Sequence, residues 1–297
     1  MAENDTKSEE SQHRARGYHG LDVDSIISVD EVNRQAEKIA KEGPGKERVA
    51  ELAGNNPYVQ IEGLNAGYGK MEILHDFHLQ VARRQSLCLI GPNGAGKSTI
   101  LHSIYGFTNI FGGNILIGEG DNKQDVTLLS SSDKLKHGGI AYILQDKSIF
   151  PGMTVEENLW MGGFLTENPD EAKEKAEKIF DKYSRLAERR KQPARVLSGG
   201  ERRLLEISRA LVMEPEVLLV DEPSIGLEPR FIDMVFEILD DLQNNEGKTI
   251  IMVEQNAKKG LEFSDIGYVL VSGQLAMAGK GDELLDDPEV GRLFLGG

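Results

Sequence analysis

The stretch that decides the fold covers residues 91 to 98 and reads Gly91-Pro92-Asn93-Gly94-Ala95-Gly96-Lys97-Ser98. It fits the eight-position pattern of a phosphate-binding loop, in which the closing glycine is followed by lysine and serine. An apolar run, Leu87 to Ile90, precedes the loop, and a helix is expected to begin near Lys97. This order of strand, glycine-rich turn and helix is the context that separates the motif from a chance turn. The stretch therefore predicts an α/β fold of the phosphate-loop type.

The loop has the chemistry needed to hold a nucleoside triphosphate with its metal ion. Glycines let backbone N–H groups converge on the phosphates, and the N-terminus of the following helix adds a favourable dipole. Lys97 supplies positive charge, and the hydroxyl of Ser98 is a ligand for Mg²⁺. We expect MgATP to bind here, with Thr99 included in the binding segment.

A second candidate element is an apolar strand that ends in two carboxylates. Val217 to Val220 is followed directly by Asp221 and Glu222. The C-terminal edge of such a buried strand faces the ligand crevice in open α/β sheets, and side chains alternate along it, so the two acids differ in role. Asp221 is expected to hold Mg²⁺, directly or through water, and Glu222 to act as general base toward the attacking water. The alternative is a solvated strand end without a catalytic role.

A second glycine motif, Leu197-Ser198-Gly199-Gly200-Glu201, opens a helix expected to span Glu201 to Val212. A serine hydroxyl and glycine N–H groups at a helix N-terminus form another anion-binding site. One chain rarely needs two such sites for one triphosphate. The surplus suggests a nucleotide site shared between two chains.

Composition limits the classes of partner. The chain has 297 residues and a formal net charge of −15, which argues against a nucleic-acid partner and against direct adsorption to anionic lipid. The single cysteine, Cys88, excludes a disulfide framework and is expected to be core packing. No apolar run reaches the roughly 20 residues needed to span a bilayer. The chain is therefore expected to be cytosolic, and any membrane role to pass through a protein partner.

The chain is expected to divide into an extension and one ATPase domain. Residues 1 to 56 are polar, with helical patterns at Val32 to Ala40 and Glu47 to Ala53. From residue 57, short apolar strands alternate with helices, as in an α/β core with a mixed sheet. A charged helix is expected over Asp170 to Arg190, in a helical subdomain at about residues 150 to 212. The expected strands, the last two forming a hairpin, are Val59 to Ile61, Leu87 to Ile90, Ile140 to Leu144, Val217 to Val220, Thr249 to Val253, Tyr268 to Leu270 and Gln274 to Met277.

The phosphate loop, Gln145, the motif at 197 to 201 and the Asp221-Glu222 strand end resemble, in this order, an ABC-type ATPase domain over residues 57 to 297. Such ATPases work as head-to-tail pairs. The resemblance implies that Ser198, Gly199 and Gly200 of one chain clamp the γ-phosphate bound by the other. The second chain is then either a copy of this chain or a paralogue.

The resemblance also implies roles for three residues whose own signals are weak. Gln145 would reach Mg²⁺ and the attacking water, although by itself it is equally an ordinary polar residue after a strand. Tyr68 matches the aromatic side chain that stacks on adenine, whereas a lone aromatic is more often core. Gln255 stands where the family usually carries a histidine that contacts the γ-phosphate, and an amide can donate there but cannot become cationic.

Three further stretches, 197 to 207, 221 to 229 and 253 to 257, are similar to ATPase subunits of branched-chain amino acid importers, with urea and amide importers close in pattern. This similarity implies permease subunits as partners, a solute-binding protein as an indirect one, and a peripheral place on the cytoplasmic face of the inner membrane. Phe150, Met153 and Trp160 are expected to be exposed in a groove for a permease helix. The alternative is a soluble, non-transport ATPase that acts as an assembly scaffold.

Overall fold

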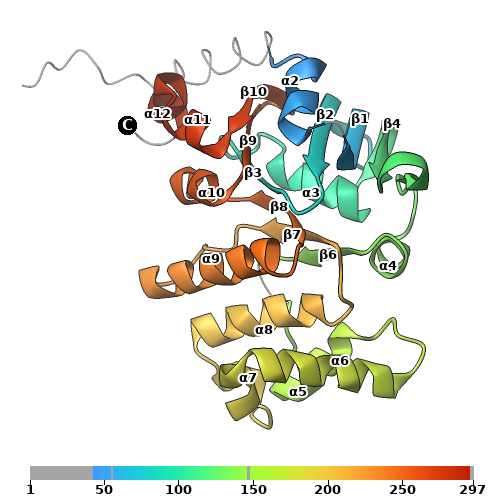
Figure 1. Cartoon of the computed structure of the whole chain (residues 1–297), viewed down its shortest axis with the longest axis vertical. Helices are drawn as coiled ribbons and strands as arrows, with labels where there is room; N and C mark the ends of the chain where they lie inside the picture. Colours follow the sequence, from blue (N-terminus) through green and yellow to red (C-terminus); the bar gives the residue numbers. More distant parts are fainter. Residues whose placement is uncertain (1–42, 55, 146–147, 295–297) are drawn as a thin grey trace, which may run out of the picture.

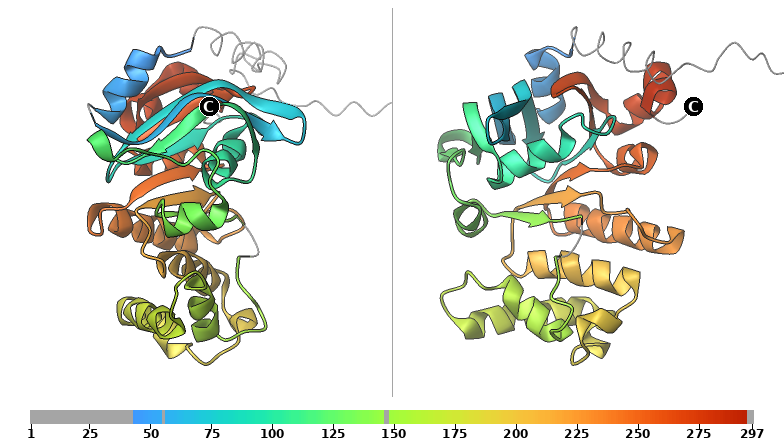
Figure 2. Two further views of the ribbon diagram at one scale, coloured as in Figure 1. Left: turned by 90° about the vertical axis from the view of Figure 1, so that its right-hand side faces the viewer. Right: turned by 180° about the vertical axis from the view of Figure 1, so that it is seen from behind.

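The computed structural model describes residues 43–54, 56–145 and 148–294 of the chain. Two sheets and a group of helices make up this part (Figure 1). Helices α5 to α8 gather at one end of the molecule, away from the four-stranded sheet, as both views of Figure 2 show. The six-stranded sheet lies between these two parts and carries the phosphate loop.

The six-stranded sheet has the strand order β10-β9-β3-β8-β7-β6. All neighbours are parallel except the final hairpin, in which β10 runs antiparallel to β9. Every residue of β3, β7 and β8 is buried, as expected for strands covered on both faces. The expected strands and hairpin of this sheet are confirmed, with bounds β3 Ser86–Ile90, β6 Ile140–Ile143, β7 Val217–Asp221, β8 Thr249–Val253, β9 Ile266–Val271 and β10 Gln274–Lys280.

A second, antiparallel sheet has the strand order β2-β1-β4-β5, whereas the sequence predicted a single mixed sheet. The expected strand Val59 to Ile61 is only the start of β1, and the other three strands were not anticipated. Polar residues on the outer face and a register shift after Ile61 interrupt the apolar pattern, although Leu64 is again fully buried. The strands are β1 Pro57–Tyr68, β2 Met71–Ala82, β4 Asn109–Ile117 and β5 Gln124–Asp125.

The helices confirm the expected segment at Glu47 to Ala53, while the pattern at Val32 to Ala40 lies outside the described residues. Short 3₁₀ turns cover Gly120–Asn122 and Ala194–Val196. The α-helices are α2 Lys46–Ala53, α3 Lys97–Tyr105, α4 Ser131–Lys136, α5 Val155–Gly162, α6 Pro169–Lys182, α7 Ser184–Glu188, α8 Gly199–Leu211, α9 Pro229–Asn244, α10 Ala257–Phe263, α11 Gly281–Leu285 and α12 Pro288–Phe294.

The prediction of a single helix over Asp170 to Arg190 is wrong, because two helices cover this segment. Helix α6 ends at Lys182 and α7 begins at Ser184, because Tyr183 leaves the helical region with φ −116° and ψ 85°. The Tyr183 side chain packs against the hydrophobic core cluster that includes Leu186 of α7. Packing of one aromatic residue thus overrides helix propensity at this position. The boundaries at residue 56 and at about residues 150 to 212 stay predictions.

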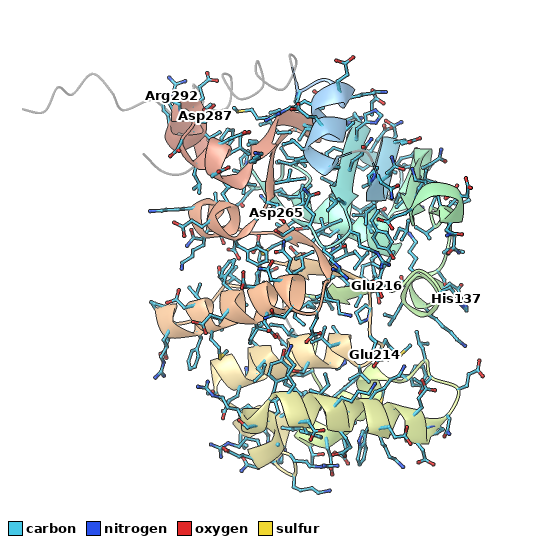
Figure 3. The ribbon with its side chains drawn as sticks, in the orientation of Figure 1. His137, Glu214, Glu216, Asp265, Asp287 and Arg292 are labelled. Atoms are coloured by element: carbon cyan, nitrogen blue, oxygen red, sulfur yellow. The ribbon has the colours of Figure 1, made fainter. Side chains whose placement is uncertain are left out.

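A polar network joins the exposed Asp265 to the buried Ser86 and Gln243 at the start of β3, the strand that leads into the phosphate loop. Asp265, labelled in Figure 3, accepts hydrogen bonds from the backbone N–H and the hydroxyl of Ser86, at 2.8 and 3.0 Å. The same carboxylate oxygen accepts a bond from Nε2 of Gln243 on α9, at 2.6 Å. These contacts join three segments far apart in sequence. These bonds therefore hold in place the start of the strand that leads into the phosphate loop.

The helices of residues 43–54, 56–145 and 148–294 are short or amphipathic. None of them combines the length and the apolar character that crossing a bilayer requires.

Candidate functional site

The phosphate loop depends on glycines at positions where the chain turns. Gly91 has φ 142°, and a Cβ there would lie 2.2 Å from the carbonyl oxygen of Leu270 in β9. Gly96 has φ 99° and precedes the first residue of α3. A residue outside the loop also holds its backbone: the N–H of Gly273, in the β9–β10 turn, donates to the carbonyl oxygen of Ala95 at 2.9 Å. The loop backbone is thus fixed independently of any ligand.

The Lys97 side chain turns back into the loop. Its ammonium group donates to the carbonyl oxygens of Gly91 and Pro92, at 2.9 and 3.0 Å. Burial lowers the pKa of Lys97, and the carboxylates of Glu222 and Asp221 oppose this shift. The nearby acids therefore favour the charged form that a phosphate needs.

Ser98 and Asp221, both predicted from the sequence to hold Mg²⁺, lie within hydrogen-bonding distance of each other. The hydroxyl of Ser98 donates to Oδ1 of Asp221 at 3.2 Å, although the two residues come from the first turn of α3 and the end of β7. Oδ2 of the same carboxylate accepts a 2.7 Å bond from the hydroxyl of Tyr142 on β6. Only 6% of Asp221 is exposed. Thr99, the next residue of α3, is buried.

Glu222 and Gln145 are also brought together. Nε2 of Gln145 donates to Oε2 of Glu222 at 2.9 Å. Glu222 has φ 42°, an uncommon conformation for a residue with a side chain, and its N–H donates to the carbonyl oxygen of Val253 at 2.9 Å. Burial raises the pKa of Glu222, and the charge of Asp221 raises it further. A carboxylate of raised pKa is a stronger base, as activation of water requires.

Gln255 lies exposed between β8 and α10, beside a buried carboxylate that the sequence analysis passed over. That carboxylate, Glu254, accepts bonds from the Ser224 hydroxyl at 2.7 Å and from the N–H of Asn256 at 2.9 Å. Ser224 follows Glu222 by two residues. Glu254 therefore links the segment after Glu222 to the segment that carries Gln255.

Tyr68 ends β1 and is 41% exposed, so its ring is accessible rather than core. Its hydroxyl forms a hydrogen bond with Nδ1 of His102 on α3. Burial lowers the pKa of His102, which favours the neutral imidazole. The His102 ring also meets the ring of Tyr142 edge to face, with centroids 5.8 Å apart. The exposed Tyr68 ring is thus held through its polar tip.

The second glycine motif forms the start of α8. The Ser198 hydroxyl accepts a bond from the N–H of Glu201 at 3.3 Å, and Oε2 of Glu201 accepts one from the N–H of Ser198 at 2.9 Å. Gly200 admits no side chain, since a Cβ would lie 2.2 Å from the Phe231 ring, and Gly199 precedes it in the first turn. Among the described residues, no hydrogen bond joins this motif to the phosphate loop of the same chain.

Besides Glu254, two residues near the site were not predicted from the sequence, namely Tyr142 and His102. Tyr142 is the one polar side chain in the apolar strand β6, three residues before Gln145, and this position was its only signal. His102 lies one helical turn after Ser98, on the helix that opens at the phosphate loop. Neither pattern names a chemical role without the spatial contact to Asp221 or to Tyr68.

Comparisons with known proteins agree with this geometry. A family model described as ABC transporter matches residues 74–225. The chain is 41% identical to the high-affinity branched-chain amino acid transport ATP-binding protein BraG of Pseudomonas aeruginosa, over 80% of this chain and 100% of the relative. It is 37% identical to the corresponding probable protein LivF of Archaeoglobus fulgidus, over 78% and 96%.

A solved structure gives the same result for the fold. The nucleotide-free ATP-binding cassette of an ABC transporter superposes with a TM-score of 0.70 at 28% identity, covering 80% of this chain and 98% of that one. The expected α/β phosphate-loop fold and the family resemblance are confirmed. The chain belongs to the ABC transporter family, as an ATP-binding subunit that hydrolyses ATP.

Proposed function

We propose that this ATPase energises the import of branched-chain amino acids, or of a related small polar solute such as urea or an amide, through membrane permease subunits. The observation that carries the proposal is the 41% identity along the whole length of a branched-chain amino acid transport ATP-binding protein. A solute-binding protein would deliver the solute to the permeases. The subunit itself would lie on the cytoplasmic face of the inner membrane, bound to them. No relative described above supports a scaffold without transport.

The test of this function is solute uptake in cells that lack the gene. We expect the loss of uptake of labelled leucine, isoleucine and valine, restored by the wild-type gene and not by one that carries Glu222→Gln. Unchanged amino acid uptake together with lost urea or amide uptake would assign the related solute. Unchanged uptake of all of them, with the protein soluble after cell fractionation, would contradict a transport role.

We propose that Mg²⁺ accompanies ATP and is held by Ser98, Asp221 and Gln145. The donor set fits, since a hydroxyl, a carboxylate and an amide oxygen are ligands that Mg²⁺ accepts, together with phosphate oxygens and water. The 3.2 Å contact between Ser98 and Asp221 supports a common ligand. When bound, the ion neutralises charge on the β- and γ-phosphates. The loop from Gly91 to Ser98, continued by Thr99, would hold the phosphates, and Tyr68 would stack on adenine.

For hydrolysis, we assign the general base to Glu222 and the orientation of the attacking water to Gln145. The 2.9 Å bond between the two side chains supports this pairing, because one water between them would meet an acceptor and a donor. The raised pKa of Glu222 has the sign that a base for water needs. Lys97 would stabilise charge that develops on the γ-phosphate.

We further propose that two chains complete each site. The capping box of Ser198 and Glu201 orders this helix start, and the N–H groups of Gly199 and Gly200 in its first turn suit an anion, as at other helix N-termini. Helix α8 lies across the six-stranded sheet from α3 in Figure 1, which supports contact with a nucleotide on another chain. The partner would be a second copy or a paralogue.

Gln255 is expected to make a smaller contribution than Glu222. An exposed amide can donate one hydrogen bond to the γ-phosphate but carries no charge, so Gln255→Ala should lower turnover only about three- to tenfold. Phosphate release by the purified variant measures this. A substitution to His should raise turnover at low pH, where imidazole is cationic, and a flat pH response of that variant would contradict contact with phosphate.

The proposed permease contact is a groove of about 450 Å³ whose lining includes residues of α4, β6, α5 and α8. The groove corrects the expected surface, because none of Phe150, Met153 and Trp160 lines it: Phe150 is 41% exposed, and Met153 and Trp160 are half-buried. Phe164, on its rim, is 75% exposed instead. The lining includes Leu144, next to Gln145, so an occupant would touch the segment that senses nucleotide.

We therefore expect Phe164→Glu to abolish copurification with the permease subunits, because a charge at the rim opposes burial of an apolar helix face. Leu128→Glu is the matched control, since Leu128 is 88% exposed and lies outside the groove. Both variants should melt at the wild-type temperature. Equal capture of permeases by the two variants would refute the groove as the docking site.

A further inference from the structure

The carboxylate of Asp221 is held by two hydroxyl groups, one on each oxygen. Ser98 donates to Oδ1 at 3.2 Å, and Tyr142 donates to Oδ2 at 2.7 Å. No other hydrogen bond to this side chain occurs within residues 43–54, 56–145 and 148–294. With only 6% of the residue exposed, water has little access to replace either donor. The orientation of the carboxylate therefore depends on these two bonds.

The Tyr142 hydroxyl is itself rigidly placed. Tyr142 lies on β6 opposite Leu219 of β7, two residues before Asp221 on that strand. Its ring contacts three others, with centroid distances of 5.4 Å to Tyr105, 5.8 Å to His102 and 5.9 Å to Phe107. Strand pairing fixes the backbone and the aromatic cluster fixes the ring. The donor consequently cannot follow the carboxylate if the latter rotates.

The two bonds differ in what a metal ion would do to them. If Ser98 and Asp221 held the ion together, the hydrogen bond between them would be given up, because both residues would then serve as ligands. The Tyr142 bond engages the other oxygen and is compatible with both situations. Hydrogen-bond partners of this kind orient a ligating carboxylate, and Mg²⁺ tolerates little departure from octahedral geometry.

We propose that Tyr142 is a positioning residue for the magnesium site: its hydroxyl sets the rotation of Asp221 so that Oδ1 faces Ser98. The inference rests on the metal role assigned to Asp221 under the proposed function. It adds a residue outside the phosphate loop and the carboxylate strand end. Loss of the hydroxyl leaves the ring in place and frees the carboxylate to turn.

The test uses the full-length chain and a non-hydrolysable ATP analogue, adenylyl imidodiphosphate, so that binding is read instead of turnover. Its affinity is measured in EDTA and across a magnesium titration for the wild type, Tyr142→Phe, Tyr105→Phe and Asp221→Asn. We expect Tyr142→Phe to raise the half-saturating magnesium concentration about tenfold and to leave binding in EDTA unchanged. Tyr105→Phe removes a hydroxyl from the same aromatic cluster and should match the wild type.

The outcomes separate this inference from the proposal beneath it. If Asp221→Asn alters the magnesium response and Tyr142→Phe does not, Tyr142 has no positioning role and the metal site stands. If Asp221→Asn responds to magnesium like the wild type, the metal assignment fails and this inference fails with it. A tenfold loss by Tyr142→Phe in EDTA as well would indicate a merely structural role and would overturn the proposal.

Discussion

Glu222→Gln should lower ATP turnover by about 10²- to 10⁴-fold, the loss usual for removal of a general base. Glutamine keeps the size of the side chain and can still meet Gln145, but it cannot take a proton from water. Binding of ATP should persist, because Lys97 and the loop are untouched. Phosphate release under saturating ATP measures turnover, and equilibrium nucleotide binding measures retention of the site.

Glu216→Gln is the matched control for this result. Glu216, labelled in Figure 3, immediately precedes β7, so it lies at the opposite end of the strand that Asp221 terminates, and its carboxylate pairs with Arg83 at 3.2 Å. It should hydrolyse ATP at the wild-type rate. If Glu222→Gln and Gln255→Ala were equally active, the assignment of the base to Glu222 would be wrong.

Ser198→Ala should lower turnover about 10²- to 10³-fold, as removal of one preorganised donor to a developing charge does. The hydroxyl would donate to the γ-phosphate held by the facing chain, so affinity of a single chain for ATP should stay unchanged. Turnover at saturating ATP and nucleotide affinity at low protein concentration separate the two effects.

The Ser198 hydroxyl also caps α8, and this role needs its own control. Ser130 caps α4 in the same way, accepting from the N–H of Asp133 at 3.2 Å. Each alanine variant should lose about 1 kcal/mol of stability, the usual effect of a lost cap. Only Ser198→Ala should lose turnover. If Ser198→Ala and Ser130→Ala lost the same amount of turnover, Ser198 would have only a structural role.

The parts of the fold that could be read from the sequence are those buried on both faces. Strands β7 and β8 are continuous apolar runs, so their position needed no knowledge of neighbours. The antiparallel sheet was largely missed because β2 has exposed polar positions and a positive φ at Asp76, which break its alternation. The helix break at Tyr183 depends on a tertiary contact of one ring, which no local pattern contains.

The site divides in the same way. Lys97, Ser98 and Glu222 belong to contiguous motifs whose residue spacing indicates their chemistry, so the sequence alone makes them candidate site residues. The bond between Tyr142 and Asp221 joins positions 79 residues apart, and only the pairing of β6 with β7 brings them together. The same holds for Tyr68 and His102. Side chains that act through a neighbour are recognised by distance, not by motif.

The attachment of the phosphate loop to the final hairpin makes the nucleotide site a property of the whole chain. The family match covers residues 74 to 225. All the predicted site residues lie within it except Tyr68, which precedes the match, and Gln255, which follows it. Gly91 lies against the carbonyl group of Leu270, and Ala95 accepts a hydrogen bond from Gly273. A fragment that ended at residue 225 would therefore keep nearly all the predicted site residues. It would lose the two contacts from the β9–β10 hairpin that hold the backbone of the phosphate loop.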